Sequence, residues 1–533
     1  MIAKLHTRLL GLKTWQRLPL GFALGAMSTF AMPPWHWLPL LWIAFPALLW
    51  MLEGCRNSKD ATLLGWSFGF GHFAIGLSWI ANAFYVDADT HGVFAIPAVG
   101  ALCALFGLFI AVVCVIVHHI DHETDGLPCD RTPTALIRAV AFALVWAVVE
   151  WVRSWLLSGF PWNPIGSVWT AWPSMIQVTS IVGTLGLSVF TILAAALPSI
   201  LGPYPRMRRA WLYAAIPTLM LFIFGGGGAL RLNPAQIEMV PGIALRLVQP
   251  NIAQADKWRP GLRDQHFMDH VRLSSEPGIE NVTHVIWGES AVAFALDRDE
   301  PRRRLAVSML RPGGALITGA PRAAVGNGGL EDIFNSMLVI APDATVAAIY
   351  DKTHLVPFGE YLPLRLLIPF PKLTEGTMDF SAGSSRTTLN VSGLPPFSPL
   401  ICYEAIFSGA VTGPSVQGHR PQWLLNITND SWFGNSSGPR QHLAAAQLRA
   451  VEEGLPLIRV ANTGISAVID PYGRILGRIE LGQRGFLDAP LPQGLKSPTP
   501  FSLTGQSGPL ALIAASLIGL IVMIRRRQAA GQS

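Results

Sequence analysis

Charged residues are scarce in this sequence: they make up 14% of its 533 residues, whereas an average soluble domain contains about 25%. Hydrophobic residues account for 51%. A soluble chain of this size could not bury that much apolar surface, so insertion into a membrane is the first hypothesis. The 18 tryptophans agree with it, because tryptophan is enriched where an apolar region meets a wet interface.

Cysteine is also sparse, and no CxxC motif or Cys/His spacing typical of a metal site occurs. Of the five cysteines, the first four lie in the apolar N-terminal half, so Cys402 is alone in the polar region. One cysteine cannot form a disulfide within that region. We therefore expect no metal and no cofactor, and we expect Cys402 to be a free thiol that is either buried filler or reactive.

Eight segments are apolar enough to be membrane spans, which need about 20 such residues each. They run from Leu18 to Met32, Trp37 to Met51, Ala61 to Tyr85, Val93 to Val117, Ala135 to Leu157, Met175 to Leu201, Trp211 to Gly228 and Pro509 to Ile524. The first has a basic start like a signal peptide, but no cleavage pattern follows it, so we expect an anchor. The sequence predicts a seven-helix transmembrane bundle in residues 1–230 and a C-terminal transmembrane helix in residues 506–527.

The basic residues predict the orientation of this bundle, because Lys and Arg concentrate in short cytoplasmic loops. One orientation places on the same side Lys4, Arg8, Arg56, Lys59, Arg131, Arg206, Arg208, Arg209 and Arg525 to Arg527. We expect a multi-pass protein of the bacterial inner (cytoplasmic) membrane, with both termini cytoplasmic and the polar segment in the periplasm. No basic groove is interleaved with stacking aromatics, so nucleic acid is not an expected partner.

The polar segment, from about residue 232 to 505, is long enough for one domain. Strands are predicted at Ala244 to Val248, His284 to Trp287, Ala315 to Thr318, Ser336 to Ile340, Val346 to Tyr350, Leu400 to Cys402, Trp423 to Ile427 and Ile465 to Ile469. Helices are predicted at Pro301 to Leu310 and His442 to Glu453. Their alternation favours a layered α/β domain in residues 240–495, followed by a linker around Lys496 to Pro500.

Three strands of this domain end directly before a residue with useful chemistry: Glu289, Lys352 and Cys402. A thiol attacks well only as a thiolate, so it needs a base or a nearby cation. A glutamate can take the thiol proton, and a lysine can stabilise an oxyanion. Taken singly, such a cysteine is usually core filler and the other two are usually surface charges. Together the three supply every role that acyl transfer requires.

The segments around these residues resemble the nitrilase superfamily and, within it, the family of bacterial apolipoprotein N-acyltransferases. The stretches that carry the resemblance are Trp287-Gly-Glu289, the long motif from Tyr350 through Lys352 and Glu360 to Tyr361, and Ile401-Cys402-Tyr403-Glu404, supported by Gln249-Pro-Asn-Ile, Lys257-Trp258, Asn429 to Gly434, Glu150 to Arg153 and Gly159 to Trp162. The resemblance covers nearly the whole chain. Gly288 departs from it, because that family usually has Pro there; we expect the added backbone freedom to have a small tuning effect.

The resemblance implies an αββα nitrilase-like (carbon-nitrogen hydrolase) sandwich joined to the membrane bundle. It implies that Glu289 is the general base, Lys352 the oxyanion stabiliser and Cys402 the nucleophile. Residues that would support the site or position lipid are Glu360, Tyr403, Glu404, Trp258 and Trp432. The implied reaction moves an acyl chain from a phospholipid, normally phosphatidylethanolamine, through a Cys402 thioester. The acceptor is the α-amino group of the N-terminal diacylglyceryl-cysteine of an apolipoprotein.

Other interpretations remain open from the sequence. Glu360 could be catalytic or could only pair with Lys352, and Trp258 and Trp432 could be ordinary core or interface aromatics. A membrane-tethered amidase or nitrilase would use the same Glu-Lys-Cys set and let water attack the thioester. A non-catalytic ligand-binding domain would have no need of an activated thiol.

Overall fold

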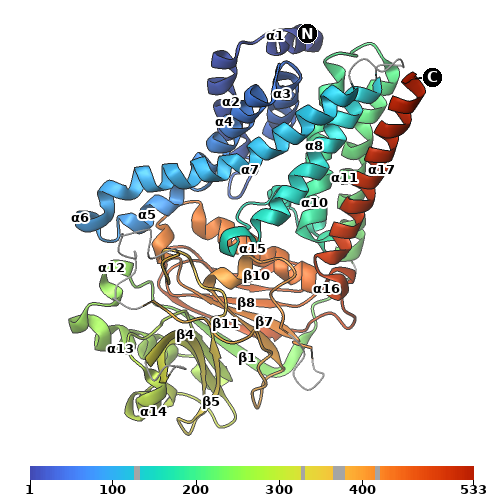
Figure 1. Ribbon diagram of the computed structural model, residues 1–533. Helices are drawn as coiled ribbons and strands as arrows, with labels where there is room; N and C mark the ends of the chain where they lie inside the picture. Colours follow the sequence, from blue (N-terminus) through green and yellow to red (C-terminus); the bar gives the residue numbers. More distant parts are fainter. Residues whose placement is uncertain (125–131, 234, 326–330, 364–378, 414–419, 533) are drawn as a thin grey trace. The chain divides into compact units, whose positions relative to one another are not determined.

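The structure is a computed structural model that describes residues 1–124, 132–233, 235–325, 331–363, 379–413 and 420–532 (Figure 1). The chain divides into two compact units. The helical unit comprises Met1–Ser78, Ile96–Pro234 and Pro500–Ser533. The second unit comprises Trp79–Ala95 and Ala235–Thr499 and is called the catalytic unit because it contains the candidate catalytic residues.

The helical unit is built from apolar helices. Its longer helices are α1 (Ile2–Leu10), α2 (Thr14–Thr29), α3 (Leu41–Glu53), α4 (Ser58–Gly76), α7 (Ala95–Thr124), α8 (Thr132–Arg153), α10 (Thr179–Ala196), α11 (Arg208–Leu232) and α17 (Ser507–Gln532). The short helices α9 (Pro173–Ile176) and α16 (Pro500–Thr504) precede α10 and α17. In the most apolar windows of α8 and α10, 72% of residues are buried inside the protein, against 22% for α11 and α17. Exposed apolar faces such as those of α11 and α17 suit contact with lipid.

Five helices of the described chain are long and apolar enough to cross a membrane. The helical segment Ser58–Gly76 and the segment Ser78–Phe84 would make a sixth span if counted together, although they meet at a bend of 51°. Helices α2 and α3, with 16 and 13 residues, are shorter than a typical span. The eight spans expected from the sequence therefore stay a prediction.

Two buried charged residues of α8, Glu150 and Arg153, are hydrogen-bonded to the segment that follows this helix. Glu150 accepts hydrogen bonds from the Trp146 ring N–H (3.1 Å) and from the backbone N–H of Ile165 (2.9 Å). Arg153 donates to the carbonyl oxygens of Phe160 (2.6 Å) and Trp162 (2.8 Å). These bonds satisfy polar groups that hydrocarbon cannot solvate, and they hold the segment that follows α8.

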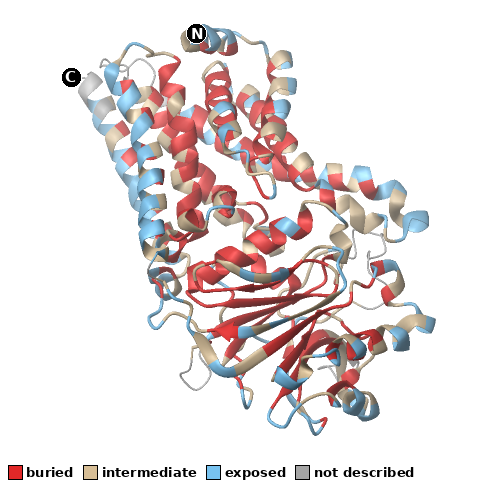
Figure 2. Cartoon of the chain, turned by 180° about the vertical axis from the view of Figure 1, so that it is seen from behind, coloured by how far each residue is buried: buried red, intermediate tan, exposed pale blue. Residues whose placement is uncertain are grey.

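The catalytic unit contains two mixed β-sheets. The strands of the first are β1 (Met239–Gln249), β2 (His284–Trp287), β3 (Ala315–Val325), β4 (Glu331–Ile340), β5 (Val346–Asp351) and β11 (Gly485–Pro492), in the order β11-β1-β2-β3-β4-β5. Those of the second are β6 (Phe397–Ile401), β7 (Trp423–Thr428), β8 (Leu457–Ala461), β9 (Ser466–Ile469) and β10 (Ile475–Ile479), in the order β10-β9-β8-β7-β6. Strands β1, β2 and β3 run parallel, as do β6, β7 and β8. Most of these strands are buried (Figure 2).

Helices cover the outer faces of both sheets. One core lies between the sheets and includes Leu245 and Ile317 of the first with Phe397 and Leu425 of the second. A second core packs α13 (Arg263–Ser274) and α14 (Glu300–Val307) on the first sheet, and a third packs α15 (Gly438–Glu453) on the second. The order of layers is thus helix, sheet, sheet, helix, which is the αββα sandwich expected from the sequence.

The segment Trp79–Ala95, called the N-terminal arm below, belongs to the catalytic unit although it comes from the apolar half of the sequence. It contains α5 (Ala81–Phe84) and α6 (Ala88–His91). Asn82 Nδ2 donates to the carbonyl oxygen of Phe433 (3.0 Å), and the Trp79 ring lies 4.4 Å from the Phe433 ring. Residues far apart in the chain are therefore packed together beside the turn that follows β7.

Candidate active site

Glu289, Lys352 and Cys402, the three candidate residues, lie at the ends of strands in the structure. Glu289 follows β2 after one glycine, Lys352 follows β5 directly, and Cys402 follows β6 directly and begins a 3₁₀ turn. All three side chains are buried. Lys352 Nζ lies 3.4 Å from Glu289 Oε1.

Lys352 lies between two carboxylates. Its ammonium is 2.9 Å from Glu360 Oε2 as well as near Glu289. Asn335 of β4 joins the two acids, since its Nδ2 donates to Glu289 Oε1 (2.7 Å) and Glu360 Oε1 (2.8 Å). Sequence reasoning missed Asn335, because nothing in a strand sequence tells a buried amide from any other polar residue. The arrangement fixes the position of all three charged groups.

Burial and neighbouring charges set the protonation of the site. Burial alone would lower the pKa of Lys352, but the carboxylates of Glu360 and Glu289 outweigh it and raise that pKa well above its ordinary value. Burial, and then the Glu289 charge, raise the pKa of Cys402, while Lys352 lowers it by less. At neutral pH the site therefore holds an ammonium beside a neutral thiol, so attack by Cys402 requires a base.

Glu404 ties the turn that begins at Cys402 to the segment after Lys352. Its Oε2 accepts from the backbone N–H of Ile401 (2.7 Å). Its Oε1 accepts from Thr353 N (2.8 Å), Thr353 Oγ1 (2.8 Å), His354 N (3.1 Å) and the Tyr350 hydroxyl (2.8 Å). This carboxylate is fully buried, so it joins two active-site segments that lie about fifty residues apart in the chain.

The aromatic candidates lie around the site in different ways. The Tyr403 ring is buried and packs against the rings of His354 (5.6 Å) and Phe407 (5.1 Å). Trp258 is half-buried at the end of α12 (Gln254–Lys257), and Trp432 is half-buried in the turn after β7. Tyr403 therefore has a packing role beside Cys402, while the two tryptophans keep part of their surface free.

A second buried lysine precedes Trp258. Lys257 Nζ donates to the backbone carbonyl of Glu289 (3.0 Å). Burial lowers the pKa of Lys257 to about 8, although the charges of Glu289 and Cys402 act in the opposite direction. The Lys257-Trp258 stretch contributed to the family resemblance, but nothing in the sequence places this ammonium beside Glu289.

Gly288 lies close to the segment that follows β8. A Cβ added there would lie 2.6 Å from the backbone N of Asn462 and 3.0 Å from the carbonyl carbon of Ala461. In this conformation a side chain at position 288 would therefore meet the backbone of that segment. The small tuning effect expected from the backbone freedom of Gly288 stays a prediction.

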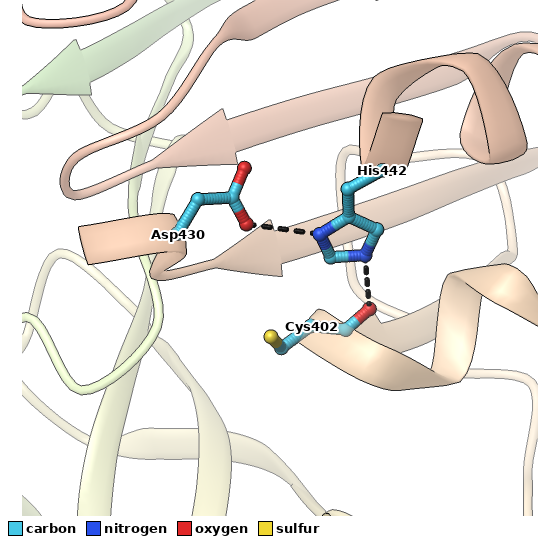
Figure 3. A group of neighbouring side chains, drawn as sticks. All are labelled: Cys402, Asp430 and His442. Atoms are coloured by element: carbon cyan, nitrogen blue, oxygen red, sulfur yellow. Dashed lines mark hydrogen bonds and ion pairs between the residues drawn. The ribbon is translucent and has the colours of Figure 1, made fainter. Parts of the chain in front are cut away.

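A further group of buried side chains surrounds Cys402 (Figure 3). The sulfur of Cys402, a carboxylate oxygen of Asp430 and a ring nitrogen of His442 lie within 4.8 Å of one another, as metal ligands would. However, His442 Nδ1 lies 2.9 Å from Asp430 Oδ1, and Arg459 Nη2 lies 2.7 Å from Asp430 Oδ2. A guanidinium already neutralises the carboxylate, so the group does not fit a resident metal. The sequence did not predict it.

The buried Glu-Lys-Cys set on an αββα sandwich defines a carbon-nitrogen hydrolase domain. Consistent with this class, residues 288–499 match the family described as carbon-nitrogen hydrolase, and residues 24–197 match the apolipoprotein N-acyltransferase N-terminal domain. Apolipoprotein N-acyltransferases of Rhodopseudomonas palustris and Bradyrhizobium diazoefficiens are 37% and 38% identical to this chain, over 96% and 97% of it and 96% of each relative. That of Brucella melitensis is 36% identical over 99% of this chain and 100% of the relative. The chain belongs to the apolipoprotein N-acyltransferase family.

Among solved structures, an amidase of the nitrilase superfamily from Nesterenkonia matches with a TM-score of 0.35 and 18% identity. The match covers 48% of this chain and 94% of the amidase.

Proposed function

We propose that this chain is an apolipoprotein N-acyltransferase that moves an acyl chain from a phospholipid, through a thioester on Cys402, to a lipoprotein. The acceptor is the α-amino group of the N-terminal diacylglyceryl-cysteine. The observation that carries the proposal is the Lys352 ammonium, held between Glu289 and Glu360 at the strand ends where Cys402 begins its turn. The names of the relatives support an apolipoprotein as the acceptor and transfer of an acyl group to nitrogen. The phospholipid donor is what the family resemblance implies.

In the first half of the reaction Glu289 accepts the proton of the Cys402 thiol, and the sulfur attacks the carbonyl carbon of the donor ester. The oxyanion that forms is stabilised by the Lys352 ammonium. Its collapse breaks the ester C–O bond and leaves the acyl group on sulfur. The proton held by Glu289 passes to the departing glycerol oxygen, and the lysophospholipid leaves.

In the second half the neutral α-amine of the acceptor attacks the thioester carbon. Lys352 stabilises the second oxyanion, and Glu289 takes a proton from the nitrogen. Cleavage of the C–S bond then gives an amide, and the proton returns to the Cys402 sulfur. An amide is more stable than a thioester, so this half runs downhill and completes a ping-pong cycle.

Glu360 acts in this scheme through Lys352. Its carboxylate is closer to the ammonium than that of Glu289, and Asn335 binds both acids. When Glu289 becomes protonated during attack, Glu360 still holds the ammonium in place and keeps it charged. We therefore assign Glu360 a positioning role, and we assign Tyr403, Glu404, Trp258 and Trp432 to support of the site or contact with lipid.

The membrane part gives the catalytic domain access to its donor. We propose that residues 1–230 and 506–527 form an eight-span transmembrane region and that residues 240–495 form the catalytic domain. Basic residues beside the apolar segments support cytoplasmic termini and a periplasmic catalytic domain in the bacterial inner membrane. Phosphatidylethanolamine is the proposed donor.

Acyl labelling of purified full-length protein tests the proposal. With acyl-labelled phospholipid and no acceptor, we expect label on Cys402 that hydroxylamine removes and that an added diacylglyceryl lipopeptide discharges as N-acyl product. The Cys402→Ala variant serves as the unlabelled control. Direct transfer without labelled enzyme would refute the thioester, and release of free fatty acid in place of lipopeptide product would favour the membrane-tethered amidase alternative.

A further inference from the structure

Four buried polar residues lie close to the Cys402 backbone. None of them has a role in the acyl-transfer steps of the proposed function. They are Asn426 on β7, Asp430 in the turn after β7, His442 on α15 and Arg459 on β8, and each is at most 1% exposed. Fully buried charged and polar groups are costly unless they are paired, so a set of four at one place needs a reason.

These four side chains form a closed circuit of contacts that begins and ends at the Cys402 carbonyl oxygen. His442 Nε2 lies 3.1 Å from that oxygen, and its Nδ1 lies 2.9 Å from Asp430 Oδ1 (Figure 3). Arg459 donates to Asp430 Oδ2 (2.7 Å) and to Asn426 Oδ1. Asn426 Nδ2 completes the circuit with contacts to the carbonyl oxygens of Cys402 (3.4 Å) and Leu400 (3.2 Å).

Thr428 connects the circuit to the surroundings of the thiol. Its hydroxyl donates to Asp430 Oδ1 (3.0 Å), and its side chain lowers the pKa of Cys402, against the larger effect of burial.

Cys402 needs such support because its backbone is strained. Its φ of +50° lies in the left-handed region, which a residue with a Cβ rarely adopts. A strained residue at a functional site persists only where its surroundings determine its conformation. Relaxation of this peptide would swing the thiol away from Glu289 and Lys352, because both follow other strands.

We propose that His442, Asp430, Arg459 and Asn426 form a Cys402 brace, a set of positioning residues that fixes the nucleophile in its left-handed conformation for attack. His442 acts by donating its Nε2 proton to the Cys402 carbonyl oxygen. Asp430 and Arg459 set the orientation of the imidazole ring, and Arg459 also orients the Asn426 amide. The proposal rests on the assignment of Cys402 as nucleophile.

The two ring nitrogens of His442 both face acceptor oxygens, Nδ1 that of Asp430 (2.9 Å) and Nε2 that of the Cys402 carbonyl (3.1 Å). Both contacts are hydrogen bonds when each nitrogen carries a proton, that is, when an imidazolium pairs with the Asp430 carboxylate. Burial and the Arg459 charge lower the pKa of His442, whereas the Asp430 carboxylate and the hydrogen bond to Cys402 raise it. Arg459 and His442 outweigh burial and hold the pKa of Asp430 at about 2, so this carboxylate is ionised.

The test compares three substitutions in full-length protein in detergent. His442→Phe keeps a ring but removes both nitrogens, whereas His442→Gln keeps an N–H that can reach the Cys402 carbonyl. The control is His284→Phe, because His284 is equally buried but lies at the opposite end of β2 from Glu289. The measured quantities are the rate constant of Cys402 acylation, the KM for phospholipid and the thermal unfolding midpoint.

We expect His442→Phe to lower the acylation rate constant by about 100-fold, as a misplacement near 1 Å commonly does, with KM unchanged. His442→Gln should recover most of this loss, and His284→Phe should acylate normally. Acylation of His442→Phe at a rate close to wild type, an equal loss in His284→Phe, or a loss that appears only in KM would overturn the brace.

Asn426→Asp provides a second route if His442→Phe does not fold. The carboxylate keeps the Arg459 contact but places an acceptor against the carbonyl oxygens of Cys402 and Leu400, so acylation should fall as in His442→Phe. The rate at which a small thiol reagent alkylates Cys402 distinguishes failure of the brace from failure of the proposed function. If the wild-type protein never carries acyl label, the proposed function fails. In that case the brace also fails if Cys402 is alkylated equally fast in the wild-type protein and in the folded variant.

Discussion

Replacing Glu404 with glutamine should destabilise the catalytic unit strongly, although the two side chains have nearly the same shape. The carboxylate accepts five hydrogen bonds, and every partner atom acts as a donor. A glutamine offers one acceptor oxygen and one amide nitrogen. In its better orientation the oxygen takes the Oε1 position and the nitrogen meets the N–H of Ile401, which then lacks an acceptor.

The expected cost has two parts. A buried donor left without a partner costs about 1–3 kcal/mol, and the other bonds weaken because their acceptor loses its charge. A total of about 3–5 kcal/mol follows, and at roughly 2–4 °C per kcal/mol for a unit of this size the unfolding midpoint should fall by about 10 °C.

Heating the detergent-solubilised protein with a thiol-reactive dye measures this change. Of the cysteines that the structure describes, Cys402 alone lies in the catalytic unit, so its exposure reports on that unit. The matched control is Glu300→Gln, which removes an exposed carboxylate paired with Arg304 and should leave the midpoint unchanged. An unchanged midpoint for Glu404→Gln would refute the idea that Glu404 joins the two active-site segments.

Four further substitutions test the site. Lys257→Met should abolish a pH-dependent gain in stability. Because folding lowers the pKa of Lys257 from 10.5 to about 8, the folded protein binds fewer protons than the unfolded protein between these two pH values. Wild type should therefore gain up to about 3 kcal/mol relative to the variant as pH rises through that window, measured as the difference in unfolding free energy. Lys352→Met should slow both acylation and discharge by about 100- to 1000-fold in single-turnover assays, and an effect on one half alone would contradict its role at both oxyanions. Glu289→Gln should slow acylation by about two to four powers of ten, and near-normal acylation would remove Glu289 from the role of base. Gly288→Ala should cost about 1–3 kcal/mol, seen as a lower unfolding midpoint, because its methyl group meets the backbone of Asn462.

The candidate catalytic residues could be found in the sequence because each stands at the end of an apolar strand. Lys352 and Cys402 come immediately after β5 and β6, and an apolar run followed by a single chemical group is visible in a linear sequence. All eight predicted strands occur in the structure. Strand β8 was missed, because Arg459 interrupts its apolar run and the partners that satisfy this charge, Asp430 and Asn426, lie about thirty residues away. Helix α13 was missed because it is mostly polar.

The helical unit was predicted less well at its boundaries. The expected span from Ala61 to Tyr85 is apolar throughout, yet helix α4 ends at Gly76 and the chain bends there by 51°. Hydropathy measures composition and cannot detect where a helix bends or which unit a residue packs against. The brace around Cys402 was invisible for a related reason: His442 and Asp430 acquire a role only through contacts that folding creates.

The N-terminal arm has a consequence for how the protein is made. Residues Trp79–Ala95 leave the ribosome about 140 residues before the rest of the catalytic unit, which starts at Ala235. Until Phe433 has been synthesised, Trp79 and Asn82 lack the surface on which they pack in the finished protein. The catalytic unit is therefore discontinuous in the gene, and a fragment that begins at Ala235 would leave part of the turn after β7 uncovered. Completion of the catalytic unit therefore requires an early segment of the chain to dock onto a late one.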